Sequence, residues 1–383
     1  MPLPTKLLYT TTNNPESGNP TLIHILSNNR WGGIERYALD ICRHFNQIGW
    51  NVFALTRDAK AVDSMFEKDG IKLLHAPLQG FYDFNSIKYL SRIFKETPNE
   101  IIIHVHGFRM AYTTLMAKKL SGKKDVKVIM SRHKVRRGVD SWILKFIYKN
   151  IDALIFVSIA ARDKFIDTWH NRILPIDHGK MHVIHNSLNI LNSEFIPPSA
   201  NRPITAMFHG PLKPGKGLET LIDAMTLLKG KRIRLRIVGA GTPDYVDKLR
   251  RRALSKGVME LIDWHKHTDN PLPLIQECDF GVLPSIQEEA FGLSNLEYMS
   301  AGRPQICSSN GAQPEYITDG WEGFLIPPSN PSFLAEKINK LATDPELRLK
   351  MGKRAFETFA QRLSWTHFIT PLTVIYTAQN SHP

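Results

Sequence analysis

The sequence predicts an α/β protein made of two doubly wound halves, each a parallel sheet with helices on both faces. Short apolar runs alternate with segments of helical period along both halves of the chain. This alternation stops between Asn186 and Pro203, where Asn, Ser and Pro dominate, and then restarts. The length of 383 residues also exceeds the ~250 residues that one hydrophobic core commonly serves. Together these observations favour two domains over one.

The individual elements follow from these runs. In the first half we expect helices at 34–48, which ends before Gly49, and at 110–120, together with strands at 22–27, 50–56, 101–106, 126–131 and 153–158. In the second half we expect helices at 218–228, 245–254 and 294–300, together with strands at 204–209, 234–238, 280–284 and 304–308. Open parallel sheets bind ligands beyond the carboxyl ends of their strands. Two such halves are therefore expected to face each other across a cleft.

Composition limits the function classes. A hydrophobic content of 42% excludes a disordered chain. Lys and Arg number 49 against 36 Asp and Glu, a formal charge of +13, which predicts a phosphorylated ligand, an anionic membrane or nucleic acid as partner. Three widely spaced cysteines favour a reduced, cytoplasmic compartment. Since no apolar run approaches the ~18 residues of a spanning helix, and no signal-peptide core is present, we expect a soluble protein or one bound at a membrane surface.

The stretch from Glu289 to Glu297 is the most informative motif. It follows a predicted strand, and Gly292 opens the helix that carries Glu297. Backbone N–H groups at a helix start can bind phosphate, and the helix dipole favours negative charge there. The two carboxylates would then accept hydrogen bonds from sugar hydroxyls. The alternative is a solvated loop glutamate and a helix-surface glutamate without function.

Two glycine loops follow other strands of the second half. Residues 210–217 nearly match a nucleotide-binding P-loop, but Gly217 stands where the motif needs Ser or Thr to hold Mg²⁺. Pro211 and Pro214 also remove backbone donors, so we expect a phosphate loop of another kind, with Lys216 as its cation. The second loop is Gly239-Ala240-Gly241, which on its own is equally consistent with a plain tight turn.

These motifs resemble a known family. Pro284-Ser285, Glu289-x7-Glu297, Met299-Ser300-Ala301-Gly302-x-Pro304 and Glu315 resemble the E-x7-E signature of GT-B retaining glycosyltransferases, above all of family 4. Weaker matches in chain order are Gly32-Gly33-Ile34-Glu35, Asn186-Ser187, Lys216-Gly217 and Gly239-x-Gly241. The resemblance extends from about Leu22 over nearly the whole chain. It implies a first domain at 1–190, a second, nucleotide-sugar-binding domain at 191–364, and a segment at 365–383 that packs back on the first.

The resemblance also implies roles for the motif residues. Glu289 would contact donor-sugar hydroxyls, Glu297 the nucleotide ribose, and Lys216 the diphosphate. The remaining donor-binding residues would be Phe291, Gly292, Leu293, Gly239 and Gly241. One departure is Pro211, where the family usually has Arg, and Lys213 could substitute for that cation. No Asp-x-Asp triplet occurs, which agrees with a transferase that needs neither a metal nor a cofactor.

The first half carries further candidates. Gly32-Gly33 opens a helix and is expected to form an acceptor or phosphate loop. We expect His104 and His106 to face opposite sides of their strand, which makes a joint metal site unfavourable, with His106 reaching the ligand and His104 in the core. By the family resemblance, His133 would contact the donor sugar and assist catalysis. Three unevenly spaced histidines are expected to be structural: His178, His182 and His185.

A basic stretch lies between Lys118 and Lys149, with only Asp125 and Asp140 opposing its cations. Apolar side chains interleave with it from Trp142 to Ile147, a pattern typical of a membrane-surface helix or of a core-packed helix with a solvated basic face. The neighbouring Arg136-Arg137 pair favours an anionic membrane or a phosphorylated lipid acceptor. Nucleic acid is disfavoured because no binding motif accompanies the charge.

The sequence therefore predicts a retaining glycosyltransferase that moves a hexose from a nucleotide sugar, with UDP expected on family frequency, to a glycan or lipid-linked acceptor in cell-surface polysaccharide or lipopolysaccharide synthesis. A sugar-nucleotide epimerase or hydrolase on the same scaffold is an alternative, since fold does not determine reaction. A catalytically silent nucleotide- or glycan-binding protein is another, which the departure at Pro211 makes conceivable.

Overall fold

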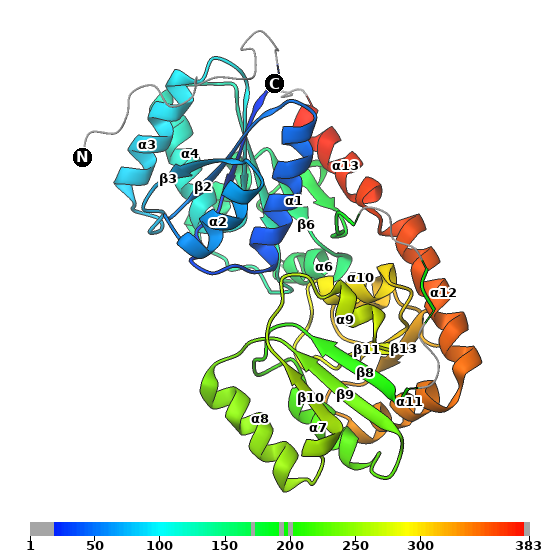
Figure 1. Cartoon of the computed structure of the whole chain (residues 1–383). Coiled ribbons are helices and arrows are strands. Elements are labelled where there is room, and N and C mark those ends of the chain that lie inside the picture. The colour runs from blue at the N-terminus through cyan, green and yellow to red at the C-terminus, as the bar shows by residue number, and fades with distance from the viewer. Residues whose placement is uncertain (1–18, 170–172, 191–194, 198–201, 379–383) are drawn as a thin grey trace. The chain divides into compact units, whose positions relative to one another are not determined.

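The computed structural model describes residues 19–169, 173–190, 195–197 and 202–378 (Figure 1). The chain divides into two compact units. Unit 1 comprises the residues up to Val157, Arg162–Ile184 and the segment from Ile369 onward. Unit 2 comprises Ser158–Ala161 and His185–Phe368. Each unit is built on its own parallel sheet, which confirms the predicted fold class.

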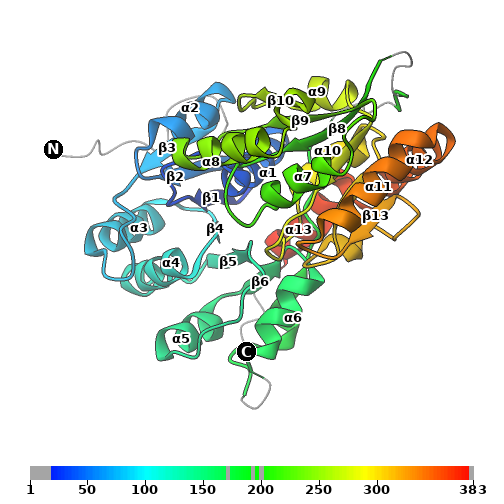
Figure 2. The same cartoon turned by 90° about the horizontal axis from the view of Figure 1, so that it is seen from below.

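In unit 1 the described strands form a seven-stranded sheet in the order β3-β2-β1-β4-β5-β6-β7. These strands are β1 (Thr21–Ile25), β2 (Asn51–Thr56), β3 (Lys72–His75), β4 (Ile101–Val105), β5 (Val126–Arg132), β6 (Ala153–Phe156) and β7 (Met181–Val183). The helices are α1 (Gly33–Gln47), α2 (Lys60–Lys68), α3 (Phe84–Glu96), α4 (Phe108–Ser121) and α5 (Trp142–Asn150), with a short 3-10 turn η1 (His178–Lys180). Two further helices, α6 (Ile159–Asp167) and α13 (Trp365–Thr377), begin in unit 2 and have their larger parts in unit 1. The strands follow one another outward in both directions from β1 and β4, and helices cover both faces of the sheet (Figure 2).

In unit 2 the described strands form a six-stranded parallel sheet in the order β10-β9-β8-β11-β12-β13. They are β8 (Ile204–His209), β9 (Ile233–Val238), β10 (Ile262–His265), β11 (Phe280–Leu283), β12 (Gln305–Ser308) and β13 (Gly323–Ile326). The helices are α7 (Leu218–Thr226), α8 (Pro243–Ser255), α9 (Leu272–Gln276), α10 (Leu293–Ser300), α11 (Pro331–Thr343) and α12 (Pro345–Arg362), with 3-10 turns η2 (Met259–Leu261) and η3 (Gln313–Glu315).

The central strands explain why the apolar runs became strands. Every residue of β1 and of β4 is buried, because helices cover both faces of a doubly wound sheet. The helix α1 ends where expected, and Gly49 follows it with a φ of 87°. In both sheets the strand order reverses at one place, between β1 and β4 in unit 1 and between β8 and β11 in unit 2. Ligand sites in open α/β sheets form at such a switch point.

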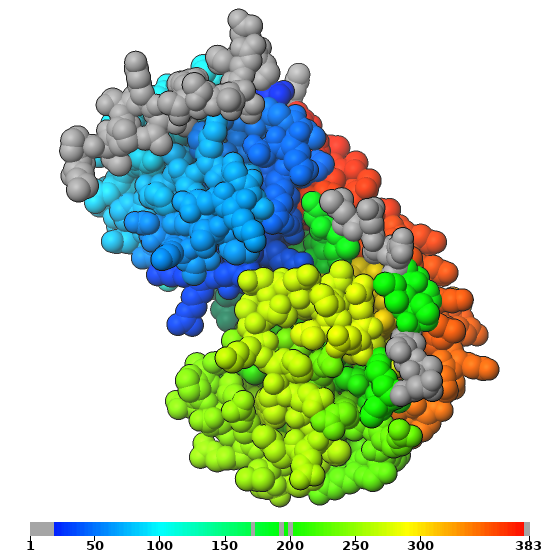
Figure 3. Space-filling model, viewed as in Figure 1, coloured from blue at the N-terminus to red at the C-terminus, as the bar shows by residue number. Residues whose placement is uncertain are grey.

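The helix α13 brings the end of the described chain back to unit 1. The ring of Tyr376 packs against Phe45 and Trp50, with ring centres 5.0 and 6.3 Å away. The backbone of α13 also contacts the sheet, because the buried ammonium of Lys127 donates to the carbonyl oxygens of Tyr376 and Ala378. Figure 3 shows the red atoms of α13 against the blue atoms of unit 1. None of the helices in the described residues has the length and apolar character needed to cross a membrane.

Candidate functional site

In unit 2 the structure brings Lys216 and Glu289 together. Lys216 precedes α7, and Glu289 lies in the loop after β11. The Lys216 ammonium donates to Glu289 Oε1 at 2.5 Å, and the hydroxyl of Ser285 donates to the same oxygen at 2.5 Å. The two charged side chains remain 20% and 19% exposed, so a ligand can reach both. A cation and an anion therefore share one accessible position at the carboxyl edge of this sheet.

The start of α10 lies beside this pair in the sequence and is held firmly. Gly292 precedes the helix with a φ of 87°, in the left-handed region that favours glycine. The hydroxyl of Tyr316 donates to the carbonyl of Phe291 and accepts from the amide of Asn295 at 2.7 Å. The first N–H groups of a helix have no partner within the helix. The predicted donor-binding amides stand at this helix start: Phe291, Gly292 and Leu293.

Glu297 is buried, so it is not the solvated helix-surface residue of the alternative interpretation. Its Oε2 lies 2.5 Å from Nε2 of His209, and each side chain is 8% exposed. His209 ends β8, at the switch point of the sheet, and its Nδ1 is a buried nitrogen without a hydrogen-bond partner. His209 is not among the residues predicted from the sequence, although a polar residue at the end of an apolar strand is a usable signal.

The glycine loops fit tightly against each other. A Cβ on Gly217 would lie 1.8 Å from the carbonyl oxygen of Pro284, and one on Gly239 would lie 2.0 Å from that of Gly210. A Cβ on Gly241 would lie 2.2 Å from the carbonyl oxygen of Leu212, whose N–H donates to Ala240. Side chains at these positions would collide with neighbouring backbone. The predicted loop glycines Gly239 and Gly241 thus allow the loops at the strand ends to pack closely.

Glu315 forms a second cluster in unit 2 that the sequence analysis left without a role. Its carboxylate accepts from the backbone N–H groups of Ile159 and Ala160 and from His185 Nε2, all at 2.8 Å. Burial raises the pKa of Glu315, but these hydrogen bonds outweigh it and lower the pKa overall. The His185 ring also packs on Phe291, with ring centres 5.2 Å apart. His185 is therefore more than an incidental histidine, because it links Glu315 to the α10 loop.

In unit 1, α1 begins at Gly33 with Gly32 before it, as predicted. The carboxyl of Glu35 is 2% exposed and accepts from Asn28 at 2.6 Å. A Cβ on Gly32 would lie 3.2 Å from this carboxyl, which is therefore close to the helix start. Burial raises the pKa of Glu35, with the Asn28 hydrogen bond opposing it. A carboxyl in this position disfavours phosphate and suits a ligand with hydroxyl groups.

His106 and His133 lie together at the carboxyl edge of the same sheet. Nδ1 of His106 is 3.0 Å from Nε2 of His133, and Nε2 of His106 is 3.1 Å from Nδ1 of His24. His133 is partly exposed, whereas His24 and His104 are fully buried. Burial lowers the pKa of His133 to about 4, and the positive charge of Lys134 adds to that effect. The ring is thus neutral near pH 7.

The expectation that His104 and His106 face opposite sides is wrong. Residues two apart along a strand share a face, and these rings stack with their centres 4.8 Å apart. His104 is nonetheless a buried residue, as expected, and both of its nitrogens are engaged. Its Nδ1 lies 2.5 Å from the hydroxyl of Tyr376, and its Nε2 lies 2.7 Å from that of Ser131.

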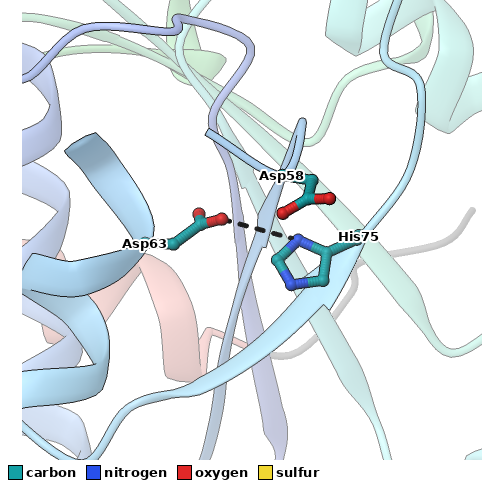
Figure 4. Close-up of side chains that lie close together, drawn as sticks. All are labelled: Asp58, Asp63 and His75. Carbon is teal, nitrogen blue, oxygen red and sulfur yellow. Dashed lines mark ion pairs between the residues drawn. The ribbon is translucent and has the colours of Figure 1, made fainter. Parts of the chain in front are cut away.

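One group of side chains in the described residues could hold a metal ion, and no metal site was predicted. Asp58, Asp63 and His75 place their ligand atoms within 4.8 Å of one another (Figure 4). The hydroxyl of Thr56 donates to Asp63 Oδ1 at 2.7 Å and lies 3.1 Å from His75 Nδ1. Asp58 is exposed to solvent. Exposed acidic groups are common without an ion, so proximity alone does not make this a metal centre.

Comparison with known proteins covers both units. Residues 31–190 match the family model for Glycosyltransferase Family 4, and residues 190–358 match the one for Glycosyl transferases group 1. The uncharacterized glycosyltransferase MJ1178 of Methanocaldococcus jannaschii is 24% identical over 361 residues, which are 90% of this chain and 94% of that protein. The lipopolysaccharide 1,2-N-acetylglucosaminetransferase of Salmonella typhimurium is 24% identical over 292 residues, 73% of this chain and 68% of that protein.

Solved structures show the same fold. A glycosyltransferase of Rickettsia africae superimposes with a TM-score of 0.81 at 19% identity, over 94% of this chain and 98% of that one. Anabaena Alr3699/HepE, in complex with UDP and glucose, superimposes with a TM-score of 0.79 at 19% identity, over 94% of this chain and the whole of that one. With two GT-B type sheets and consecutive family matches from residue 31 to 358, the chain belongs to the group 1, family 4 glycosyltransferases, which transfer a sugar from a nucleotide-sugar donor.

Proposed function

We propose that this glycosyltransferase moves a hexose from a UDP-sugar to a glycan or lipid-linked acceptor, with retention of the anomeric configuration, in the synthesis of a cell-surface polysaccharide or lipopolysaccharide. The observation that carries the proposal is the contact between Lys216 and Glu289 beside the start of α10. This position offers a cation and helix N–H groups to a diphosphate, and a carboxylate to sugar hydroxyls.

The chemistry of donor binding follows from that contact. When the donor binds, its diphosphate replaces Glu289 as the partner of Lys216, and the freed carboxylate accepts hydrogen bonds from the sugar. The bond between the anomeric carbon and the diphosphate then breaks, and the acceptor oxygen bonds to that carbon on the same face. The proton of the acceptor hydroxyl passes to the departing phosphate oxygen. Lys216 and the α10 amides stabilise the negative charge that develops on the leaving group. The buried Glu297 accepts hydrogen bonds from the ribose, and His209 holds its carboxylate in place.

Unit 1 supplies the acceptor side of the proposal and one catalytic residue. His133 is a neutral imidazole at the end of β5, and we assign it a contact with the donor sugar in catalysis. His106 and the Gly32-Gly33 loop lie at the carboxyl edge of the same sheet. Because Glu35 disfavours phosphate near Gly32, this loop suits the hydroxyls of a glycan acceptor.

The surface around α5 supports an acceptor at the membrane. Leu144 and Ile147 are buried in unit 1, but Trp142 and Val139 are 69% and 62% exposed. The neighbouring Arg136 is exposed as well, within the basic stretch that begins at Lys118. Exposed apolar side chains among cations are the pattern of a surface that inserts between anionic headgroups. The proposed site of action is therefore the inner face of a membrane. The proposal includes no nucleic acid as a partner.

Liposome co-sedimentation tests this surface directly. The protein is expected to sediment with vesicles that contain anionic lipid, and Trp142→Ala is expected to weaken that binding. Trp321, which is 50% exposed in unit 2, gives a matched control substitution, Trp321→Ala, which should leave binding unchanged. Sedimentation with neither kind of vesicle would remove the membrane claim, and equal sedimentation with both would remove the proposed preference for anionic lipid.

Relatives support the donor and the pathway class. The Anabaena structures contain UDP, glucose and UDP-glucose, and the Salmonella typhimurium relative is a lipopolysaccharide N-acetylglucosaminetransferase. The deciding experiment measures release of nucleoside diphosphate from a panel of sugar nucleotides, with and without candidate acceptors. The transferase releases UDP only when an acceptor is present. Acceptor-independent release would identify a hydrolase, conversion of the donor sugar without release an epimerase, and binding without turnover a silent protein.

A further inference from the structure

A continuous chain of hydrogen bonds runs through unit 1 and ends at His133. Three imidazole rings form its outer part, because His24 bonds to His106 and His106 bonds to His133. The hydroxyl of Tyr376 lies 3.4 Å from Nε2 of His24 and continues the chain to His104. Such a run of buried polar side chains is costly unless every member has a partner.

Counting protons along the outer part gives a strict rule. A neutral imidazole carries one N–H, so one of its nitrogens donates and the other accepts. If His24 donates from Nδ1, then His106 accepts at Nε2, carries its proton on Nδ1 and donates it to Nε2 of His133. His133 then carries its own proton on Nδ1. If His133 instead donates from Nε2 to His106, and His106 donates from Nε2 to His24, all three rings carry the proton on Nε2. The three rings must share one tautomer.

The rule holds only while the rings are neutral, and their surroundings keep them so. Burial lowers the pKa of His24 to about 3, with a smaller contribution from His133, and it lowers the pKa of His106 well below its usual value, with His104, His133 and His24 contributing. Tyr37 restricts ring rotation as well. Its ring packs edge-on against His106 and His133, with ring centres 5.7 and 4.9 Å away.

We propose that His24 and His106 are positioning residues that fix the tautomer of His133, so that the three rings change tautomer only together. They thereby decide whether Nδ1 of His133 meets a ligand as a donor or as an acceptor. When the tautomer changes, one proton enters at Nε2 of His24, beside the Tyr376 hydroxyl, and one leaves from Nδ1 of His133, so the number of protons on the three rings stays the same. The part of this inference that concerns turnover rests on the proposed function, whereas the part that concerns tautomers does not.

The tautomers can be measured without any substrate. Long-range ¹H–¹⁵N correlation spectra of the whole protein, labelled with ¹⁵N-histidine, distinguish the two neutral tautomers and the imidazolium of each ring. Single substitutions assign the signals of His24, His106 and His133 among the 15 histidines. We expect the same neutral tautomer in all three rings near pH 7. Different tautomers among them, or an imidazolium, would overturn the proposal.

Substitutions test the positioning role. His106→Phe removes both hydrogen bonds and should change the tautomer populations of His133, with kcat reduced by roughly 10-fold and the donor KM unchanged. His106→Asn places an amide near the position of Nδ1 and should restore much of the lost kcat. His178, an exposed histidine of unit 1, gives the control His178→Gln, which should match the wild type. An unchanged His133 signal in folded His106→Phe would contradict the proposal.

A further variant separates this inference from the proposed function. His133→Ala is expected to reduce turnover strongly while circular dichroism shows a folded protein. If that variant keeps wild-type turnover, the catalytic role of His133 fails, yet the shared tautomer measured in the wild type stands. If the tautomers differ but His133→Ala is inactive, the positioning role fails and the catalytic role stands.

Discussion

The polar sites of the two units occupy equivalent places in the fold but differ in charge. In unit 1 the site gathers where β1 and β4 adjoin, with His24 and His104 paired across the two strands. In unit 2 it gathers where β8 and β11 adjoin, at His209 and the loop after Leu283. The first site consists mainly of neutral rings and hydroxyls, with the buried carboxyl of Glu35 at the start of α1. The second pairs carboxylates with Lys216 and histidines.

This difference indicates what each switch point can bind. A neutral network can donate to and accept from hydroxyl groups, but it offers no net charge to a phosphate. A cation paired with a carboxylate can exchange its partner for a diphosphate and return to it after release. The shared topology therefore supplies the location, and the side chains at the strand ends supply the ligand preference.

The sharpest way to break the comparison is to remove the cation of unit 2. Lys216→Ala is expected to reduce kcat by about 10²- to 10³-fold, because charge on the departing diphosphate loses its nearest side-chain cation. Steady-state kinetics with the preferred sugar nucleotide measure the effect. Lys256→Ala, an exposed lysine at the end of α8, is the control and should behave as the wild type. Near-normal kcat for Lys216→Ala would place the diphosphate elsewhere.

Because the buried histidines of unit 1 are neutral, we predict that acid lowers the free energy of unfolding. The pKa of His24 is lowered to about 3, and that of fully buried His104 lies well below its usual value. Both groups titrate near 6.5 in the unfolded chain. As the pH falls below about 6.5, these histidines therefore bind protons in the unfolded state but remain unprotonated in the folded state. Each of these two histidines should lower the free energy of unfolding by roughly 1 kcal/mol per pH unit.

Urea unfolding midpoints over a pH series measure this slope. His24→Phe should flatten it, whereas the exposed His178→Gln should not. A stability that does not change between pH 6.5 and 4.5 would show that the histidines of unit 1 are charged in the folded protein. The contrast with unit 2 would then be lost.

Glu297→Gln tests whether the buried carboxylate of unit 2 serves the donor. The variant should raise the donor KM about 10-fold with little change in kcat, since a charge-assisted hydrogen bond to the ribose becomes a neutral one. His209→Phe should shift KM in the same direction by releasing the carboxylate. Glu260→Gln, at an exposed glutamate, is the control. A fall in kcat alone would instead assign Glu297 to the chemical step.

The smallest expected effect is an improvement in donor binding. Pro211 is exposed in the loop after β8, at the position where the family resemblance leads us to expect Arg. Pro211→Arg should lower the donor KM about 3-fold, the size of an added interaction between partly exposed charges. Pro211→Ala separates the loss of the proline ring from the gain of the cation. An equal change in both variants would mean that the ring, and not the missing charge, matters.

The sequence predicted the buried strands of both sheets because their apolar runs are unbroken. It did not reveal β3 at one edge of the first sheet, where only Leu74 is buried, nor the two edge strands of the second sheet, β10 and β13. It singled out Lys216 and Glu289, which the structure places in contact, because each lies in a recognisable motif. It did not predict His24 or His209. His24 meets His106 across 82 positions of the chain, and His209 meets Glu297 across 88. Only the folded sheets bring those residues together.

The return of α13 to unit 1 has a consequence for synthesis on the ribosome. Domains commonly fold as they emerge, the N-terminal one first. Here the strands of unit 1 emerge early, but Tyr376, whose hydroxyl bonds to His104, is translated after all of unit 2. Until α13 has been synthesised, the nascent unit 1 therefore lacks the Tyr376 hydroxyl in its histidine chain. It also lacks the carbonyl partners of Lys127. Catalytic competence and the last folding step would then coincide in time.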